Sequence, residues 1–595
     1  GRATSLDPVY GNDAMEVILN DYQEAPGTYG SRDVTIDNVH LLGGTGFFHH
    51  MDYIAMDRLT IRNCVSKTTT TFVTIVPQYQ FDSANPGSTL PTYHSRVLIE
   101  DNHATCSEVQ PNGYGFEVYN PHGILLGSCP DYVVRNNLIE GFIGRGISVP
   151  QPIQWAGLDI NDDPQTDQLQ ESWGCIEGNT LIRTGWEGIL TGTSKFGTGS
   201  SVSPGARGMT KILNNTIIDH NSLPLHVYNA GTIEKSLGIW AQDSAAPAIR
   251  HQGMDVIISG NVIERVGGEN TWPVLAPGAP QDEPDFYNST YHPLIVVSGG
   301  YNNIWGPNKG NGMLDEYMAS NVQITDNVNK STLGHTFIDL YWVDGAQVSG
   351  NFEQSYNWPY QVQGVSSLGE YAGRFASVNA ATIRNVDFSN NQFGSYVTYG
   401  AEVPNTGGTR CFNIRFVNNN VSANRKMSIG FGGAPGGEAN PAVMAAEHNY
   451  ISGNRFNGSS VNLTQINGRT MNTVFSENDM SFCPEPDMSL YPSGDQEKMD
   501  HLGGSIFMTA ERAHVDGSRI VNNYTGGGNI SIMEFADNET VVNGTELRYP
   551  SYAGVVVSGN NTLYSRFGIN RNHDPTTWEL GYIPALIQKP LDGGY

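Results

Sequence analysis

The sequence predicts an all-β solenoid of stacked parallel strands, and three observations lead to this prediction. Glycine makes up 69 of the 595 residues, above the usual share of ~7%, and charged residues make up only 15%, against a typical ~25%. A short apolar pattern recurs along almost the whole chain, and Asn occupies one fixed place in most of its copies. Gly and Asn favour turns, whereas the abundant Val and Ile favour strands, so helices are not expected.

The recurring pattern has two apolar residues separated by one position, and an Asn three positions after the second. Val256, Ile258 and Asn261 form the clearest copy, and the apolar Ile263 follows. Alternation with a period of two predicts a strand with one buried face, and we expect the Asn itself to adopt the left-handed backbone of a sharp turn. The Asn residues in this place are Asn102, Asn137, Asn179, Asn215, Asn261, Asn327, Asn351, Asn391, Asn419, Asn454, Asn478, Asn523 and Asn560.

This spacing predicts a right-handed parallel β-helix in which each repeat is one coil. Neighbouring strands of a sheet lie ~4.8 Å apart, so the amides of successive Asn residues can bond one another in a ladder. A β-propeller would instead need four antiparallel strands in each blade. We expect residues 1–30 to be a lead-in or N-terminal cap and residues 31–562 to form the β-helix with long loop insertions. Residues 563–595 then form a short C-terminal cap.

The coils with an Asn ladder resemble the pectate-lyase-like parallel β-helix superfamily. Within it, the chain is most similar to bacteriophage tailspike depolymerases, over roughly residues 30–560. The resemblance implies a homotrimer on the virion tail that binds bacterial surface polysaccharide, with a secreted protein as the alternative location. The fold alone does not determine the activity, because lyases, hydrolases, epimerases and adhesins share it.

The net charge of −27 excludes several classes of partner. Nucleic acid requires a basic surface, and anionic membranes attract basic segments. No apolar run approaches the ~20 residues that a membrane-spanning helix needs, so membrane insertion is not expected. A local basic patch could still bind an anionic polysaccharide. The six cysteines form no C-x-x-C pair, and we expect neither a cofactor nor a metal ion.

In the superfamily that the chain resembles, the substrate groove follows one strand ladder and the loops after it. The strands that we place on this ladder are 116–119, 147–149, 189–191, 225–228, 295–297, 338–341 and 360–363. Glycoside hydrolysis needs two carboxylates, ~5–5.5 Å apart for retention or ~6.5–9.5 Å apart for inversion. The candidate catalytic residues are Asp339, Asp243, Glu187 and His226. We expect Asp339 to point outward, where an acid beside Phe337, Ile338 and Leu340 is costly unless it is exposed or used, with His226 two coils away, roughly 10 Å.

Aromatic residues are frequent in the same region, and their faces can stack on sugar rings. The candidate substrate-binding residues are Trp186, Trp240, Trp305, Trp342, Tyr228, Tyr341, Glu117 and Gln361. The alternative interpretation is structural: the Trp side chains would pack loops onto the solenoid, and the acidic side chains would be solvated at the surface.

The sequence favours a glycoside hydrolase that cleaves bacterial capsule, O-antigen or exopolysaccharide. A polysaccharide lyase or epimerase is the first alternative and would use a basic residue; the candidates, all expected in loops, are Lys195, Arg207, Lys235 and Arg250. This alternative also predicts a calcium site, for which the acidic segment 159–163 is the candidate. The second alternative is an adhesin that binds glycan without cleaving it.

Overall fold

The computed structural model is all-β in the part of the chain that it describes. These residues are 31–44, 48–50, 56–68, 71–75, 95–106, 122–127, 129, 131–150, 173–192, 208–222, 225–229, 232–236, 246–265, 293–299, 318–331, 336–354, 377–394, 397–399, 410–422, 427–431, 445–457, 460–462, 469–480, 505–509, 517–524, 529–535, 541–542, 545–546, 555–561, 564–570 and 587–589. The expected lead-in lies outside them. The chain forms two compact units, Gly1–Asn303 with Met313–Gln323 and Asn327–Leu333, and Ile304–Gly312 with Ile324–Asp326 and Gly334–Tyr595. We describe each by itself.

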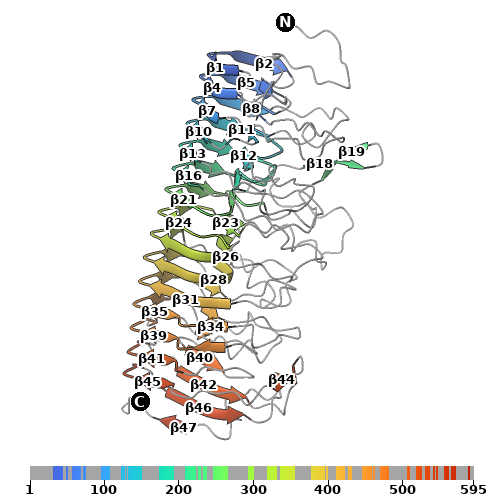
Figure 1. The fold of residues 1–595 in the computed structure, drawn as a ribbon. Helices are drawn as coiled ribbons and strands as arrows, with labels where there is room; N and C mark the ends of the chain where they lie inside the picture. Colours follow the sequence, from blue (N-terminus) through green and yellow to red (C-terminus); the bar gives the residue numbers. More distant parts are fainter. Residues whose placement is uncertain are drawn as a thin grey trace. The chain divides into compact units, whose positions relative to one another are not determined.

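In the first unit, parallel strands form three ladders, which we call the first, second and third sheets (Figure 1). The first sheet consists of β1 (Ser31–Asp37), β4 (Met56–Arg62), β7 (Ser95–Glu100), β10 (Asp131–Arg135), β13 (Trp173–Glu177), β16 (Thr210–Leu213) and β21 (Val256–Ser259). The second consists of β2 (His40–Gly44), β5 (Val65–Thr68), β8 (His103–Cys106), β11 (Leu138–Glu140), β14 (Thr180–Ile182), β17 (Thr216–Ile218), β22 (Val262–Glu264) and β25 (Val328–Asn329).

The third sheet of the first unit consists of β3 (Phe48–His50), β6 (Val73–Ile75), β9 (Ile124–Leu126), β12 (Ile147–Pro150), β15 (Ile189–Gly192), β20 (Ile249–Gln252) and β23 (Pro293–Ser298). One coil therefore gives one strand to each sheet, as β10, β11 and β12 do. This confirms the predicted parallel β-helix. It also confirms that the predicted strands at 147–149, 189–191 and 295–297 share one ladder.

The second unit has the same plan. Its first sheet contains the second half of β26 (Thr336–Ser349), the second half of β28 (Val378–Ser389), β31 (Arg410–Val417), β35 (Tyr450–Ser452), β39 (Val474–Ser476), β41 (Arg519–Val521) and β45 (Val556–Ser558). Its second sheet contains β27 (Phe352–Glu353), β29 (Gln392–Phe393), β32 (Asn420–Val421) and β36 (Arg455–Phe456). Inside this unit, the Phe416, Phe456 and Phe475 rings stack with centroids 6.4 and 5.9 Å apart.

The third sheet of the second unit contains the first halves of β26 and β28, then β30 (Val397–Tyr399), β33 (Met427–Phe431), β37 (Ser460–Asn462), β40 (Ser505–Thr509), β42 (Asn529–Phe535) and β46 (Tyr564–Asn570). The parallel pairing of β42 with β46 extends past residue 562, where we expected the helix to end. β47 (Ile587–Lys589) then pairs with β46 in the antiparallel direction.

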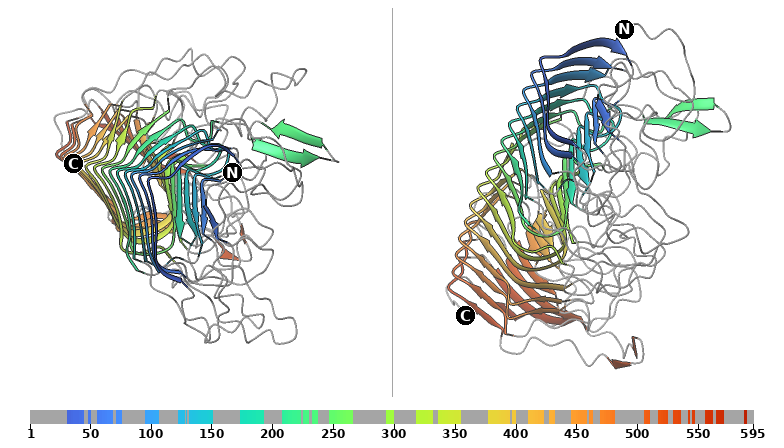
Figure 2. Two further views of the ribbon diagram at one scale, coloured as in Figure 1. Left: turned by 90° about the horizontal axis from the view of Figure 1, so that it is seen from above. Right: turned by 45° about the horizontal axis from the view of Figure 1, so that its top comes forward.

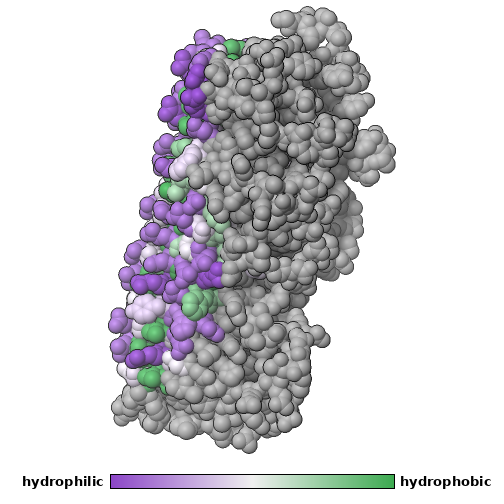
Figure 3. Space-filling view, viewed as in Figure 1, coloured by the Kyte–Doolittle hydropathy of each residue, from purple (hydrophilic) through white to green (hydrophobic). Residues whose placement is uncertain are grey.

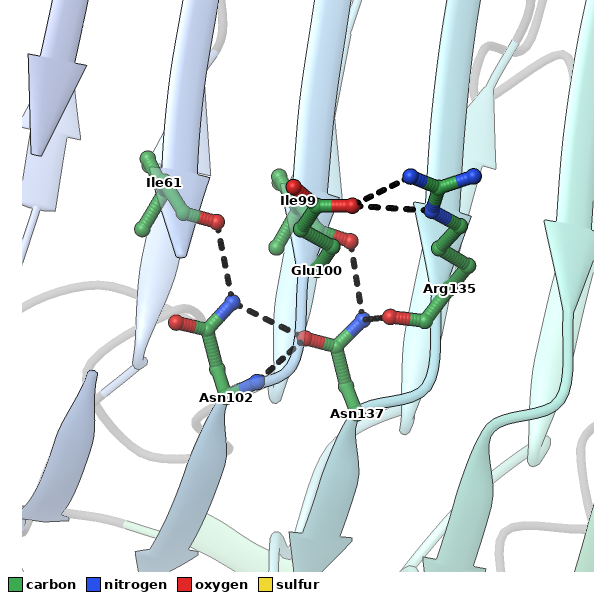
Figure 4. A network of polar contacts seen from close by, with 6 residues as sticks. All are labelled: Ile61, Ile99, Glu100, Asn102, Arg135 and Asn137. Atoms are coloured by element: carbon green, nitrogen blue, oxygen red, sulfur yellow. Dashed lines mark hydrogen bonds and ion pairs between the residues drawn. The ribbon is translucent and has the colours of Figure 1, made fainter. Parts of the chain in front are cut away.

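The predicted Asn ladder is present in both units. Figure 4 shows its geometry at Asn102, whose Nδ2 donates to Ile61 O at 3.0 Å and to Asn137 Oδ1 at 2.9 Å. The backbone N–H of Asn102 donates to the same Asn137 oxygen at 3.1 Å. In the first unit these bonds link Asn102, Asn137, Asn179, Asn215, Asn261 and Asn327 in that order. In the second unit they link Asn351, Asn391, Asn419, Asn454, Asn478, Asn523 and Asn560.

The left-handed backbone lies one residue before the ladder, which corrects our expectation for the ladder Asn itself. Asn136, Asn214 and Gly260 are examples, with φ of 55°, 53° and 68°. A second left-handed residue often lies five positions earlier, within the same first-sheet strand or just before it. Such pairs include Asp33 and Asn38, Arg58 and Asn63, Arg96 and Asp101, Asp255 and Gly260, Asn385 and Asn390, Asn413 and Asn418, His448 and Gly453, and Asn472 and Glu477. Two adjacent residues therefore divide the work: the first adopts the left-handed turn, and the second, the ladder Asn, makes the amide hydrogen bonds.

The third sheet differs from the first in what lies on its outer face. On β10, Tyr132 and Val134 are buried while Asp131 and Arg135 are exposed, and Figure 3 shows the visible described surface as mainly hydrophilic. In the third sheet of the first unit, β6, β9, β15 and β23 are buried at every residue. Parallel sheets covered on both faces are normally apolar throughout. Polar and ionisable side chains on this covered face therefore require an explanation.

The ladder makes a testable prediction at Asn215. Replacing Asn215 with Ala leaves the buried N–H of Asn179 and the carbonyl of Ile176 without their bonds to this amide. We expect the free energy of unfolding, measured in urea, to fall by about 3 kcal/mol or more, because each buried unsatisfied group costs about 1–3 kcal/mol.

The neighbouring Asn214 is the matched control. It is exposed and has φ 53°, so Asn214→Gly should change the unfolding free energy little, since Gly adopts this conformation readily. Equal effects of Asn214→Gly and Asn215→Ala would contradict the division of roles between the two positions.

Candidate active site

A column of polar residues runs along the edge of the third sheet in the first unit. Thr71, His122, Arg145 and Glu187 each lie two residues before a third-sheet strand, on successive coils. The backbone N–H of His122 donates to Thr71 Oγ1 at 3.0 Å, and the backbone N–H of Arg145 donates to His122 Nδ1 at 2.8 Å. Arg145 Nε then donates to Glu187 Oε2 at 2.8 Å. The column is therefore continuous over four coils.

The column ends in a shared ion pair. Glu187 Oε2 contacts Arg145, and its Oε1 lies 3.2 Å from Nε of Arg250, which is on strand β20 of the next coil. The Arg145 guanidinium also lies over the Trp186 ring, 4.6 Å from its centroid. The side chains of Glu187, Arg145 and Arg250 are 7%, 12% and 29% exposed. We call Trp186, Arg145, Glu187 and Arg250 the Glu187 cluster.

The electrostatics of this cluster determine the state of Glu187. Burial alone would raise the pKa of Glu187, but the charges of Arg145 and Arg250, together with hydrogen bonds, outweigh it and hold this pKa below its usual value. The carboxylate is therefore ionised at neutral pH and has no proton to donate as a general acid. A catalytic role for Glu187 would therefore be that of a nucleophile or a general base, and its contacts also fit a residue that positions two arginines.

His122 is neutral in this environment. Burial, followed by the charge of Arg145, lowers the pKa of His122 to about 3, and Glu187 offsets this only in part. A neutral imidazole agrees with the hydrogen bond that Nδ1 accepts from the Arg145 backbone. Inside the same sheet, burial lowers the pKa of His251 to about 4, and its Nδ1 lies 2.9 Å from Thr191 Oγ1.

A second polar cluster lies on the third sheet of the second unit. Asp339 on β26 alternates with Ile338 and Leu340, whose register partners on β28 are buried. The outward direction that we expected for Asp339 agrees with this alternation. Of the two conditions that we allowed for an acid at this position, exposure does not hold, because Asp339 is fully buried. The pattern of one strand does not reveal whether its outer face is covered.

Tyr341 and Asn379 complete this second cluster. Tyr341 is two residues after Asp339 and therefore on the same face, and Asn379 is the register partner of Asp339 on β28. Asn379 Nδ2 donates to the Tyr341 hydroxyl at 2.9 Å. We call Asp339, Tyr341 and Asn379 the Asp339 cluster. It places a carboxyl group, a phenol and an amide side by side on the outward face.

Trp342 follows the Asp339 cluster directly and has an unusual backbone. Its φ is 58°, and a bulky residue rarely occupies this left-handed region. The side chain is half-buried. Two residues later, Asp344 accepts hydrogen bonds from Arg384 Nε at 2.8 Å and from Asn385 Nδ2 at 2.7 Å. A strained backbone conformation persists only where the surrounding structure holds it in place. Such conformations are concentrated at functional sites.

The structure corrects the prediction for His226 and Tyr228. Both lie on β18 (Leu225–Asn229), which pairs in the antiparallel direction with β19 (Thr232–Ser236) in a separate hairpin. Figure 2 shows this hairpin apart from the stacked sheets. The third-sheet strand of this coil is β20 instead, so the expected spacing of His226 from Asp339 has no basis. An alternating pattern looks the same in a hairpin strand as in a coil strand, which explains the error.

Several other predicted residues lie outside the described part of the chain. They are Asp243, Trp240, Trp305, Glu117, Gln361, Lys195, Arg207 and the acidic segment 159–163. Of the remaining basic candidates, Lys235 is on β19 and Arg250 is on β20, not in loops as we expected. Among the described residues, no group of three or more His, Cys, Asp or Glu side chains could hold a metal ion.

The sequence carries a signal for the column that the strand pattern alone does not contain. His122, Arg145 and Glu187 each precede the same dipeptide, Gly-Ile. The glycines are required by close packing: a Cβ on Gly146 would lie 2.7 Å from the Gly188 carbonyl oxygen. Three copies of a charged or polar residue before Gly-Ile therefore mark one edge of the third sheet. Asn379 had no comparable signal, because its role depends on its register with Asp339.

Comparisons with known proteins add little to this picture. No protein-family model and no curated protein matches the chain. Among solved structures, the chain is similar to the A-module of the mannuronan C-5 epimerase AlgE6 of Azotobacter vinelandii, with 8% sequence identity and a TM-score of 0.27. The match covers 89% of this chain and 90% of that chain. So distant a likeness carries no argument, and the fold rests on the strand pairing described above. No helix in the described part is long and apolar enough to cross a membrane.

The Glu187 cluster makes a prediction about stability. Glu187→Gln leaves Arg145, which is largely covered, and Arg250, which is partly exposed, without their shared buried anion. We expect the unfolding free energy at pH 7 to fall by about 3 kcal/mol, the lower end of the cost of breaking a buried ion pair, because Arg250 is partly exposed. Since the folded pKa of Glu187 is below the unfolded value of about 4.3, its contribution is present above that pH and lost as the pH falls through the folded pKa. The variant should therefore lose less stability than the wild type on acidification, as measured by urea unfolding.

Glu140→Gln is the matched control. Glu140 pairs with Arg183 at 2.6 Å, but Arg183 is exposed and Glu140 is about one-third exposed, so the loss of this pair should cost at most about 1 kcal/mol. If Glu187→Gln were no more destabilising than this control, the cluster would not be the buried, structurally required ion pair described here.

Proposed function

We propose that this chain is a polysaccharide depolymerase that hydrolyses glycosidic bonds of bacterial surface polysaccharide. The observation that supports this most directly is the Asp339 cluster. It places a fully buried acidic side chain beside a phenol and an amide on the covered face of a parallel sheet. Burying an ionisable group is costly, and groups in such environments are concentrated at functional sites.

The three side chains of the Asp339 cluster match the needs of glycan chemistry. A carboxyl group in a covered site can act as the acid or as the nucleophile of glycoside hydrolysis. A Tyr hydroxyl and an Asn amide supply both hydrogen-bond donors and acceptors, which sugar hydroxyl groups require. In the described residues, the register neighbour of Asp339 on β28 is Asn379, so that position does not supply the second carboxylate of a hydrolase.

A polysaccharide lyase is the second candidate. It is favoured by Arg250, which lies on a strand of the third sheet and is partly exposed there. Elimination requires a base and a cation that neutralises an acidic sugar, and Arg250 with Arg145 provides the cationic groups. Hydrolysis and elimination leave different products, so one assay separates them.

The assembly that we propose follows from the resemblance to phage tailspikes. In this proposal the chain is a homotrimer on a virion tail, and its ligand is the capsule, O-antigen or exopolysaccharide of a host bacterium. Light scattering of the purified protein should then give three times the mass of one chain. A monomer at the same concentration would argue against the tailspike assembly and leave the enzymatic proposal intact.

The enzymatic proposal predicts activity and its loss on substitution. We expect the protein to release new reducing ends from a member of a panel of purified capsular, O-antigen and exopolysaccharides, without the ultraviolet absorbance of unsaturated sugar ends. Asp339→Asn should reduce the rate by at least ~100-fold, the usual contribution of a general acid or base, while the polysaccharide still binds. Asp387→Asn, on the first-sheet part of β28 beside Arg415, should leave the rate unchanged.

Three results would contradict this assignment. Absorbance that rises together with the reducing ends would replace hydrolysis by elimination. Full activity of Asp339→Asn would exclude Asp339 as the reacting group. Binding without new ends on any polysaccharide would favour an adhesin.

A further inference from the structure

Arg250 occupies an exceptional place on the third sheet of the first unit. Its outward row contains Thr74, Leu125, Ser148, Leu190 and Val296, which are the register neighbours along the ladder. All five of these side chains are buried, with exposed fractions of 9% or less. The Arg250 side chain is 29% exposed. The Arg250 side chain is therefore the partly accessible member of an otherwise buried row.

Arg145 and Arg250 are held differently, although they share Glu187. Arg145 donates to Oε2 at 2.8 Å and lies over the Trp186 ring, which fixes it between an anion and an aromatic face. Arg250 approaches Oε1 at a longer distance of 3.2 Å. Arg145 is thus the anchored member of the pair, and Arg250 is the member nearer to solvent.

The charges within the Glu187 cluster favour an anionic ligand. Its two arginines and one glutamate carry one more positive than negative charge. A guanidinium presents planar, paired N–H groups that match the geometry of a carboxylate. The flanking register neighbours Leu190 and Val296 are apolar, and an apolar surrounding strengthens such a charged interaction.

We propose that Arg250 binds a carboxylate of an acidic polysaccharide, and that Glu187, anchored by Arg145, positions Arg250 for this contact. The substrate would then contain uronic or other carboxylated sugars, despite the net charge of −27. This inference rests on the proposed function, because it names the class of polysaccharide that the protein binds.

The test compares each polysaccharide that the full chain binds with its carboxyl-reduced form, in which the acidic groups have become neutral alcohols. Isothermal titration calorimetry gives the dissociation constants. We expect the wild type to bind an acidic polysaccharide ~10- to 100-fold more tightly than its reduced form, the range of a charge-assisted hydrogen-bonded pair. Arg250→Gln should bring this ratio close to one by lowering the affinity for the acidic polysaccharide only. A purely structural defect would instead lower the affinity for both forms equally.

Two further variants complete the experiment. Arg250→Lys keeps the charge but not the planar fork, and should retain part of the ratio. Arg183→Gln removes an exposed, ion-paired arginine from the turn after the second sheet and should leave the ratio unchanged. If Arg250→Gln does not fold, Arg250→Lys still tests the role of Arg250, because a ratio equal to that of the wild type would contradict the planar contact.

The outcomes separate the inference from the proposed function. A ratio that persists in Arg250→Gln, or binding of neutral polysaccharides only, would overturn the role of Arg250 while the depolymerase proposal stands. If no polysaccharide in the panel is bound or cleaved, the proposed function fails and this inference fails with it.

Discussion

The stacking of coils depends on one buried side-chain amide per turn of the chain. Asn179 shows why: its Nδ2 donates to Val134 O of the preceding coil at 2.9 Å and to Asn215 Oδ1 of the following coil at 3.0 Å. Its own oxygen accepts from the backbone and side chain of Asn137. Each amide therefore joins three coils and satisfies backbone groups that a turn would otherwise leave unpaired. The constant spacing of the ladder brings residues that are distant in the sequence into alignment on the other sheets.

The polar column and the Asp339 cluster are consequences of that alignment. Arg145 and Glu187 are 42 residues apart in the sequence but occupy the same place on neighbouring coils. Asp339 and Asn379 meet in the same way, through the register of β26 with β28. A parallel solenoid thus builds sites along its axis, one residue from each coil. The Arg62–Asp37 ion pair on the first sheet follows the same rule but remains exposed, so it contributes little to stability.

The fold was predictable from sequence because its signals are local. The alternation of Val97 and Ile99 before Asn102 predicts a strand, a turn and a ladder position within six residues. The same pattern recurs along the chain. The structure confirms the register, although the left-handed turn falls on the residue before the ladder Asn. The hairpin of His226 could not be distinguished, because pairing direction depends on a distant partner and not on the pattern.

The sites were less predictable for a physical reason of another kind. Asp339 and Glu187 were recognisable as acids near the third sheet, but their burial and their partners depend on other coils and on what covers the outer face. Sequence periodicity gives the direction of a side chain and not its solvent exposure. The Gly-Ile dipeptides at the start of three third-sheet strands form a repeat of their own, and this repeat aligns His122, Arg145 and Glu187.

The self-matching character of the ladder has a consequence for how such a chain can change its length. Every ladder position bonds to another Asn in the same geometry, so a coil inserted between Asn137 and Asn179 would meet the partners that it needs on both sides. No new interface chemistry has to arise for the insertion to fold. Whole coils can then be gained, lost or exchanged as cassettes, while each cassette carries its own connecting loops. The number of coils can therefore change without a change in the functional side chains that the other coils and their loops carry.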